Sequence, residues 1–103
     1  MDPDIGEIIA TRNYRLVDED NNERAVSVLV GKPQPAKDSQ DYQCPFQVIG
    51  IGNQITQVAR GYDAIQALQS ALILISANLN HLNNELGRKL IWDGGRKGEL
   101  GFP

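Results

Sequence analysis

The first half of the chain alternates short apolar runs with polar turns, which is the pattern of antiparallel strands. Residues 8–17 and 24–30 are rich in strand-forming side chains, and the polar cluster 18–22 separates them. Two such runs around a short polar turn indicate a β-hairpin. Because the run 24–30 carries apolar residues at both odd and even positions, both of its faces are expected to be covered and the strand to be central.

A second hairpin is predicted from residues 44–51 and 55–60, which flank the turn residues Gly52 and Asn53. Gly50 lies inside the first of these runs, where a glycine indicates a bulge or a close approach of another backbone. The polar, proline-containing segment that joins the two hairpins is predicted to be the longest and most mobile loop.

The second half of the chain carries one long helical pattern. Apolar residues recur there at alternating spacings of three and four, the period of one helix face. Asp63 is suited to cap the first turn, Gln66 stands in the capping-box position, and Gly87 suits the end of the helix. A helix over 63–86 is therefore predicted. Its apolar stripe consists of Ile65, Leu68, Leu72, Ile75, Leu79, Leu82 and Leu86, and it is broadened by Ala64, Ala67, Ala71 and Leu74.

Together these elements predict a single α+β domain over residues 1–103. A four- to five-stranded, mainly antiparallel sheet made of the two hairpins packs against the long amphipathic helix near the C-terminus. Residues 89–92 are expected to form the short fifth strand. The glycine-rich C-terminal tail is expected to dock back on the body through Leu100 and Phe102, with Trp92 as an anchor.

Charge and cysteine usage exclude several classes of protein. Ten Lys and Arg against 13 Asp and Glu give a net charge of −3, whereas proteins that grip phosphate backbones need clustered cations. Nucleic-acid binding is therefore not expected. After the helix, Arg88, Lys89, Arg96 and Lys97 form a modest positive patch, which Asp93 and Glu99 offset.

The setting expected for the chain is the cytoplasm. The single cysteine, Cys44, cannot form an internal disulfide, and no basic and apolar leader follows Met1. No apolar run approaches the ~20 residues that a bilayer requires, so no membrane partner is expected.

One acidic turn resembles the start of a calcium-binding loop. Asp18, Asp20 and Asn22 stand at alternate positions, but such a loop needs Gly at its sixth position and Glu at its twelfth. This chain has Glu23 and Leu29 there. A solvated hairpin turn is therefore expected, and no metal.

His81 and Cys44 are the other candidates for chemistry. Within one helical turn of His81 only Glu85 offers an orienting carboxylate, and the chain has no second histidine. Cys44 fits a small buried residue at the start of a strand. No catalytic residue and no cofactor are predicted, which favours a non-enzymatic protein.

The polar face of the predicted helix is unusual because it carries no charge. No Asp, Glu, Lys or Arg occurs between Ala64 and Asn84, although a solvent-facing helix usually carries ion pairs. The centre of an interface tolerates uncharged polar groups, since charges are costly to desolvate. We expect this face to form a homodimer or to bind a protein partner, and a solvated face is the alternative. The predicted interface residues are Gln69, Ser76, Asn80, His81, Asn83 and Asn84.

A second hypothesis is a small-ligand-binding or catalytic domain. Its pocket would lie between helix and sheet near Cys44, Tyr62 and His81. This hypothesis requires an apolar cavity on which those polar groups converge.

Three segments of the chain are similar to a known family. They are 42–52 (YQCPFQVIGIG), 61–68 (GYDAIQAL) and 98–103 (GELGFP). On these segments the chain resembles a family of small uncharacterised bacterial proteins, a domain of unknown function. The resemblance covers nearly the whole chain and implies a bacterial origin and one compact domain, and it transfers no site residue.

Overall fold

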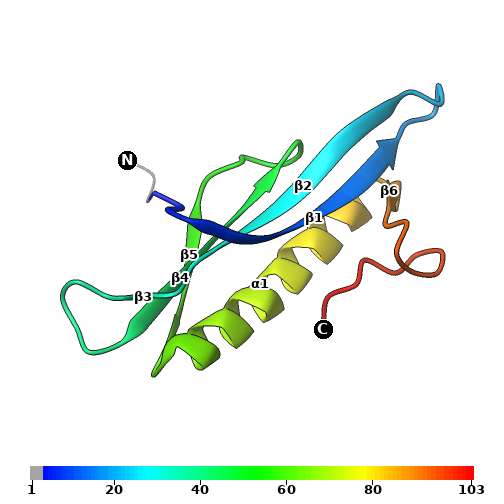
Figure 1. Cartoon of the computed structure of the whole chain (residues 1–103). Coiled ribbons are helices and arrows are strands. Elements are labelled where there is room, and N and C mark those ends of the chain that lie inside the picture. The colour runs from blue at the N-terminus through cyan, green and yellow to red at the C-terminus, as the bar shows by residue number, and fades with distance from the viewer. Residues whose placement is uncertain (1–3) are drawn as a thin grey trace.

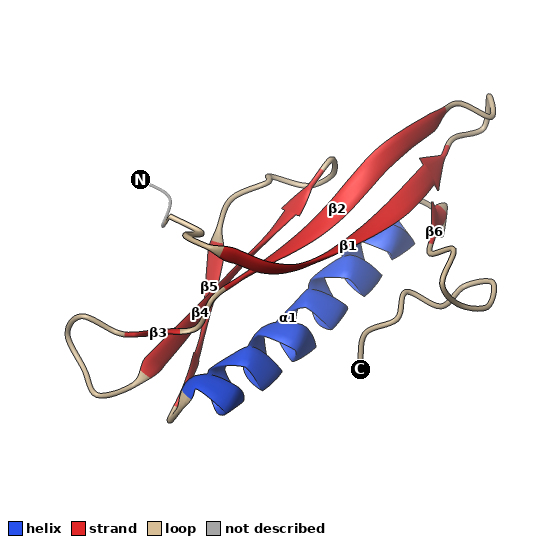
Figure 2. Cartoon of the chain, in the orientation of Figure 1, coloured by secondary structure: helices blue, strands red, loops and turns tan. Residues whose placement is uncertain are grey.

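A computed structural model describes residues 4–103 as an antiparallel sheet with one long helix across one of its faces (Figure 1). Figure 2 shows the strands and the helix as two separate layers. The α+β class, the two hairpins and the long helix are confirmed. In chain order the elements are β1 (Ile8–Val17), β2 (Glu23–Gly31), β3 (Gln34–Pro35), β4 (Tyr42–Ile49), β5 (Gln57–Gly61), α1 (Ala64–Glu85) and β6 (Leu90–Ile91).

The strands lie in the order β3, β4, β2, β1, β6. β2 and β3 pair with successive parts of one edge of β4, and β5 pairs with the opposite edge. β2 is central, as its apolar residues on both faces predicted: it pairs with β1 on one side and with β4 on the other. The predicted fifth strand is present as β6, which pairs with the end of β1 at Arg15 and Leu16. Residues 1–3, at which the sequence predicts no leader, lie outside the described residues.

The segment between the hairpins is more ordered than predicted. Gln34 and Pro35 form β3 and pair with Gln43 and Tyr42 of β4. Ala36 is buried, which anchors the segment to the body. A strand of two residues is too short to produce an alternating pattern, so the pairing is decided by β4 and not by local sequence.

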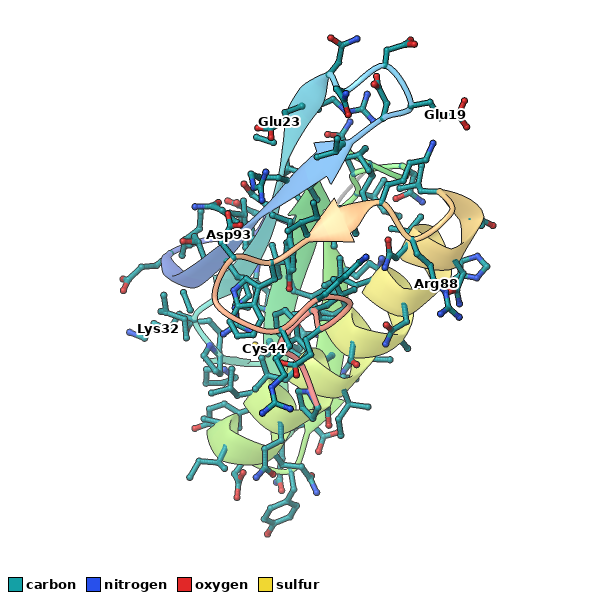
Figure 3. All side chains as sticks on the ribbon, turned by 90° about the vertical axis from the view of Figure 1, so that its right-hand side faces the viewer. Glu19, Glu23, Lys32, Cys44, Arg88 and Asp93 are labelled. Atoms are coloured by element: carbon teal, nitrogen blue, oxygen red, sulfur yellow. The ribbon has the colours of Figure 1, made fainter. Side chains whose placement is uncertain are left out.

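The core fills the space between the helix and one face of the sheet. Alternate residues of β1, β2 and β4 point toward the helix, and Cys44 lies inside the molecule in Figure 3. The end of β5 and the first turn of the helix approach each other closely at Gly61, where an added Cβ would clash with the backbone nitrogen of Ala67. Gly50 also confirms a predicted close approach, because a Cβ there would lie 2.5 Å from the carbonyl oxygen of Ala25.

The buried line of α1 differs from the predicted apolar stripe. Ala67 and Ala71 are buried as predicted, but Ile65 is 69% exposed and Leu74 is 43% exposed. For Ile65 the reason is the close approach at Gly61, which leaves room for alanine and not for a branched side chain. Leu68, Leu72, Leu82 and Leu86 are only partly buried. The buried residues are Ala67, Ala71, Ile75, Leu79 and Asn83.

Both ends of the helix follow the predicted chemistry. The Asp63 carboxylate accepts from the backbone N–H of Gln66 at 2.8 Å. The Gln66 side chain in turn accepts from the backbone N–H of Tyr62 at 2.6 Å, one residue before the N–H group that a capping box uses. Gly87 has a φ of 76°, the left-handed conformation that ends many helices.

The C-terminal tail docks back on the sheet as predicted. Leu100 is buried, and its carbonyl oxygen accepts from the hydroxyl of Tyr14. The guanidinium of Arg12 donates to the carbonyl oxygen of Gly101 at 2.6 Å and lies over the ring of Phe102, 5.0 Å from its centroid. The tail therefore closes the helix side of β1.

Candidate functional site

The three residues of the predicted ligand pocket do not converge. Cys44 has no exposed surface, whereas Tyr62 is 81% exposed just before α1. His81 lies nineteen residues further along the chain, roughly 28 Å away at the helical rise per residue. It lines a cavity of about 180 Å³ beside the turn between β4 and β5, which is smaller than most organic ligands occupy.

Cys44 and His81 lie in different surroundings, one buried and the other exposed. The Cys44 thiol donates to the carbonyl oxygen of Gly31 at 3.5 Å. Burial raises the pKa of this thiol above its ordinary value, so the reactive thiolate is disfavoured at neutral pH. His81 contacts Glu85, the carboxylate predicted to orient it, at 3.1 Å, and both side chains are exposed.

The acidic turn between β1 and β2 is an ordinary solvated turn. The Asp18 carboxylate accepts from the backbone N–H groups of Asp20 and Asn22 at 2.9 and 3.0 Å. Its oxygen is used to hold the turn itself, as Asp side chains often do. Within residues 4–103 no group of three or more His, Cys, Asp or Glu could hold a metal ion.

The predicted interface residues divide into three groups by their burial. Asn83 is buried, and its side-chain oxygen accepts from the backbone N–H of Leu90 at 3.0 Å. It ties the end of α1 to β6 and does not reach the surface face. Ser76 is half-buried and accepts from the Asn80 amide at 3.5 Å. Exposed on α1 are Gln69, Asn80, His81 and Asn84.

Two large apolar side chains stand at the centre of this uncharged surface. Ile73 is 60% exposed and Leu74 is 43% exposed, and Ala77 is exposed one turn further on. The sequence analysis did not identify Ile73, although its position in the helix indicates its exposure. Ile73 lies two positions from the buried Ile75 and therefore on the opposite side of the helix. We call the surface of Gln66, Gln69, Ile73, Leu74, Ala77, Asn80 and Asn84 the outer helix face.

A second surface lies where α1 ends and the chain turns through β6 into the tail. Here a cleft of about 590 Å³ opens, and the predicted positive patch lines it. We call it the basic cleft. Its cations are Arg88, Lys89, Arg96 and Lys97, and its apolar wall is made of Val17, Leu90, Ile91 and Trp92.

Asp93 does not offset the patch in the way the sequence predicted. Its carboxylate forms an ion pair with the guanidinium of Arg15 at 2.8 Å, and Arg15 also contacts Glu23 at 2.8 Å. The hydrogen bonds from Arg15 lower the pKa of Asp93 below its ordinary value. Figure 3 shows Asp93 and Arg88 on different sides of the tail loop. Asp93 lines the cleft, but Arg15, which it shares with Glu23, offsets part of its negative charge.

Trp92 is fixed in place by the tail and by β1. The guanidinium of Arg12 lies over its ring, 4.3 Å from the centroid, an attractive cation–π arrangement. Gly94 and Gly95 pack against the ring, where an added Cβ at either position would lie 2.7 Å from ring atoms. The two adjacent glycines of the tail are therefore explained by their contact with Trp92.

Comparison with known proteins identifies the family. Residues 10–103 match the family described as a domain of unknown function (DUF6968), and the chain belongs to it. No curated protein and no solved structure matches the chain. Across residues 4–103, no helix is both long enough and apolar enough to cross a membrane.

Proposed function

We propose that this member of the DUF6968 family is a non-enzymatic protein–protein interaction module that forms a homodimer through its outer helix face. The observation that carries the proposal is Ile73, which is 60% exposed in the middle of a helix surface without charge. We place this dimer in the cytoplasm of a bacterium, because the one thiol is free and buried and the sequence resembles bacterial proteins.

A second copy of the chain is the partner that this surface fits best. Each copy carries a net charge of −3, so two copies repel each other wherever their charged surfaces meet. The outer helix face offers a contact without charges, and a twofold axis brings the same face to both sides. Ile73 and Leu74 supply the apolar centre of such a contact, and the surrounding Gln and Asn side chains supply its polar rim.

The size of the surface predicts a weak dimer. A helix of 22 residues is ~33 Å long and ~10 Å wide, so a pair buries on the order of 700 Å² in total. Stable complexes bury at least about 1,200 Å². We therefore expect a dissociation constant in the micromolar range, and a monomer in dilute solution.

Sedimentation velocity over a concentration series from about 5 to about 500 µM tests the proposal, because this range brackets a micromolar equilibrium. The sedimentation coefficient of the wild type is expected to rise with concentration. Ile73→Glu and Asn80→Glu each place a charge in the contact and are expected to remain monomeric throughout. Glutamate is a good helix former, so both variants are expected to fold.

The matched control is Asn13→Glu. Asn13 is exposed on the sheet face that points away from α1, so the variant has the same change in charge at a distance from the contact. It is expected to dimerise like the wild type. A wild type that stays monomeric at every concentration contradicts the proposal, and so does an Ile73→Glu variant that dimerises normally.

A further inference from the structure

We propose that the basic cleft binds a small organic phosphate, a molecule that joins adjacent negative charges to an apolar body of about nucleotide size. The cleft lies at the C-terminal end of α1, between β6 and the tail loop, and it does not include the outer helix face. This inference is independent of the proposed dimer. It rests on the charge, the size and the rigidity of the cleft.

The cleft concentrates positive charge in a protein that is negative overall. Four of the ten cations of the chain line it, although the net charge is −3. Among residues 4–103, the ion pairs within 4.0 Å leave out Arg88, Arg96 and Lys97. Cations that gather without carboxylate partners repel one another, so folding alone does not favour this arrangement.

The nearby acids do not neutralise the cleft. Asp93 lines the cleft and forms an ion pair with Arg15, which Glu23 shares, and the four cations of the cleft outnumber the carboxylates that Arg15 leaves unmatched. Glu19 approaches Lys89 at 3.4 Å from the exposed tip of the first hairpin, where its side chain is 88% exposed and easily displaced. Glu99 lies near Gly95 in the tail loop and is the one remaining carboxylate of this loop. The cleft therefore keeps an excess of positive charge that a phosphate can match.

The size and the apolar wall of the cleft indicate an organic molecule and not a free phosphate ion. A volume of about 590 Å³ falls in the range of pockets for small organic ligands. Leu90 forms the buried floor, and Ile91, which is 38% exposed, presents apolar surface beside it. The two arginines, Arg88 and Arg96, have the planar groups that bind phosphate oxygens in pairs.

The cleft is also preformed. The side-chain oxygen of Asn83 accepts from the backbone N–H of Leu90 at 3.0 Å, and the guanidinium of Arg12 lies over the ring of Trp92. Tyr14 fixes the far end of the tail loop at Leu100. A wall that is already rigid loses little entropy when a ligand binds, which raises affinity.

Trp92 makes occupancy of the cleft directly measurable. It is the one tryptophan of the chain and lines the cleft, so its fluorescence reports on bound ligand. The probes are ADP, which has charges and an aromatic body, pyrophosphate, which has the charges alone, and adenosine, which has the body alone. We expect a saturable change with ADP, binding at least about tenfold weaker with pyrophosphate, and none with adenosine. Affinity for ADP is expected to fall steeply as salt is added.

Charge-removing variants locate the binding. Arg96→Gln with Lys97→Gln is expected to weaken ADP binding at least about tenfold, which corresponds to 1.4 kcal/mol or more. Arg88→Gln approaches the cleft from the helix and serves if that double variant fails to fold by circular dichroism. The control is Lys32→Gln with Lys37→Gln, which removes the same charge. Figure 3 shows Lys32 on the opposite side of the molecule from Arg88, and the control is expected to bind ADP like the wild type.

Three results overturn the proposal. The first is no fluorescence response to either ADP or pyrophosphate at millimolar concentration, because the phosphate charges are common to every ligand of the class. The second is equal affinity for pyrophosphate and ADP, which would mean that the apolar body of the ligand contributes nothing to binding. The third is equal weakening in the control pair, which shows attraction to the whole protein and not to the cleft.

Discussion

Replacing Tyr14 by Phe removes one oxygen atom and is expected to loosen the tail from the sheet. The Tyr14 side chain is 3% exposed, and its hydroxyl donates to the carbonyl oxygen of Leu100. Phe keeps the packing of the ring, but the buried carbonyl loses its donor. Such a loss costs about 1 to 3 kcal/mol, so we expect the free energy of unfolding to fall by about 2 kcal/mol at pH 8.

The same residue makes the stability depend on alkaline pH. Burial raises the pKa of Tyr14 from 10.0 to about 12, although the nearby guanidinium of Arg12 acts in the opposite direction. The unfolded chain therefore releases this proton at lower pH than the folded protein. The stability due to the neutral phenol is complete below pH 10 and is lost as the pH rises toward 12. A shift of this size corresponds to about 2 to 3 kcal/mol.

Urea unfolding followed by far-ultraviolet circular dichroism measures both effects. Wild type and Tyr14→Phe are expected to differ by about 2 kcal/mol at pH 8 and to approach each other as the pH nears 12. Comparing the two chains cancels the titration of lysines and of the other tyrosines. Tyr62→Phe is the control, since Tyr62 is 81% exposed, and it is expected to follow the wild type at every pH.

Two results refute this reasoning. If Tyr14→Phe is as stable as the wild type at pH 8, the hydroxyl does not hold the tail. If the difference between the two chains stays constant up to the highest pH, the pKa of the Tyr14 phenol is the same in the folded and the unfolded chain, and burial does not raise it.

Three other substitutions test the packing of α1 by urea unfolding. Gly61→Ala places a Cβ where it clashes with the backbone of Ala67 and is expected to cost about 2 kcal/mol or more; a loss below about 0.5 kcal/mol contradicts the close approach. Asn83→Leu leaves the N–H of Leu90 without its acceptor and is expected to cost about 1 to 3 kcal/mol; unchanged stability means that this bond does not hold β6. Ile65→Ser changes a side chain that is 69% exposed and is expected to stay within about 0.5 kcal/mol; a larger loss places Ile65 in the core.

The elements that could be predicted are those whose cause is local. The cap at Asp63 needs only Gln66 three residues later, and the hairpin between β1 and β2 needs only two apolar runs and a polar turn. Cys44 could also be predicted to be buried from its place in an apolar strand. In each case the hydrogen bond or the side-chain period that causes the structure lies within a short window.

The candidate sites could be predicted only in part. The absence of charge on the outer helix face is visible in the sequence, but the inward turn of Asn83 depends on Leu90 in another element. The positive patch is visible as well. The cleft that this patch lines cannot be read from the sequence, because its charge depends on the ion pair between Asp93 and Arg15, which are 78 residues apart in the chain. Pairs at such separations leave no periodic signal.

The sequence by itself determined the strands, the long helix, the central place of β2 and the neutrality of one helix face, because propensity, capping and periodicity act between near neighbours. Tertiary structure alone decided how closely the helix packs on the sheet. Gly61 lies against the backbone of Ala67, and Ile65 faces the solvent. Tertiary structure also decided that the tail, which the sequence predicted to dock, does so on Tyr14, and that the basic cleft opens beside it. These outcomes depend on which surfaces meet, and close packing between distant segments selects them.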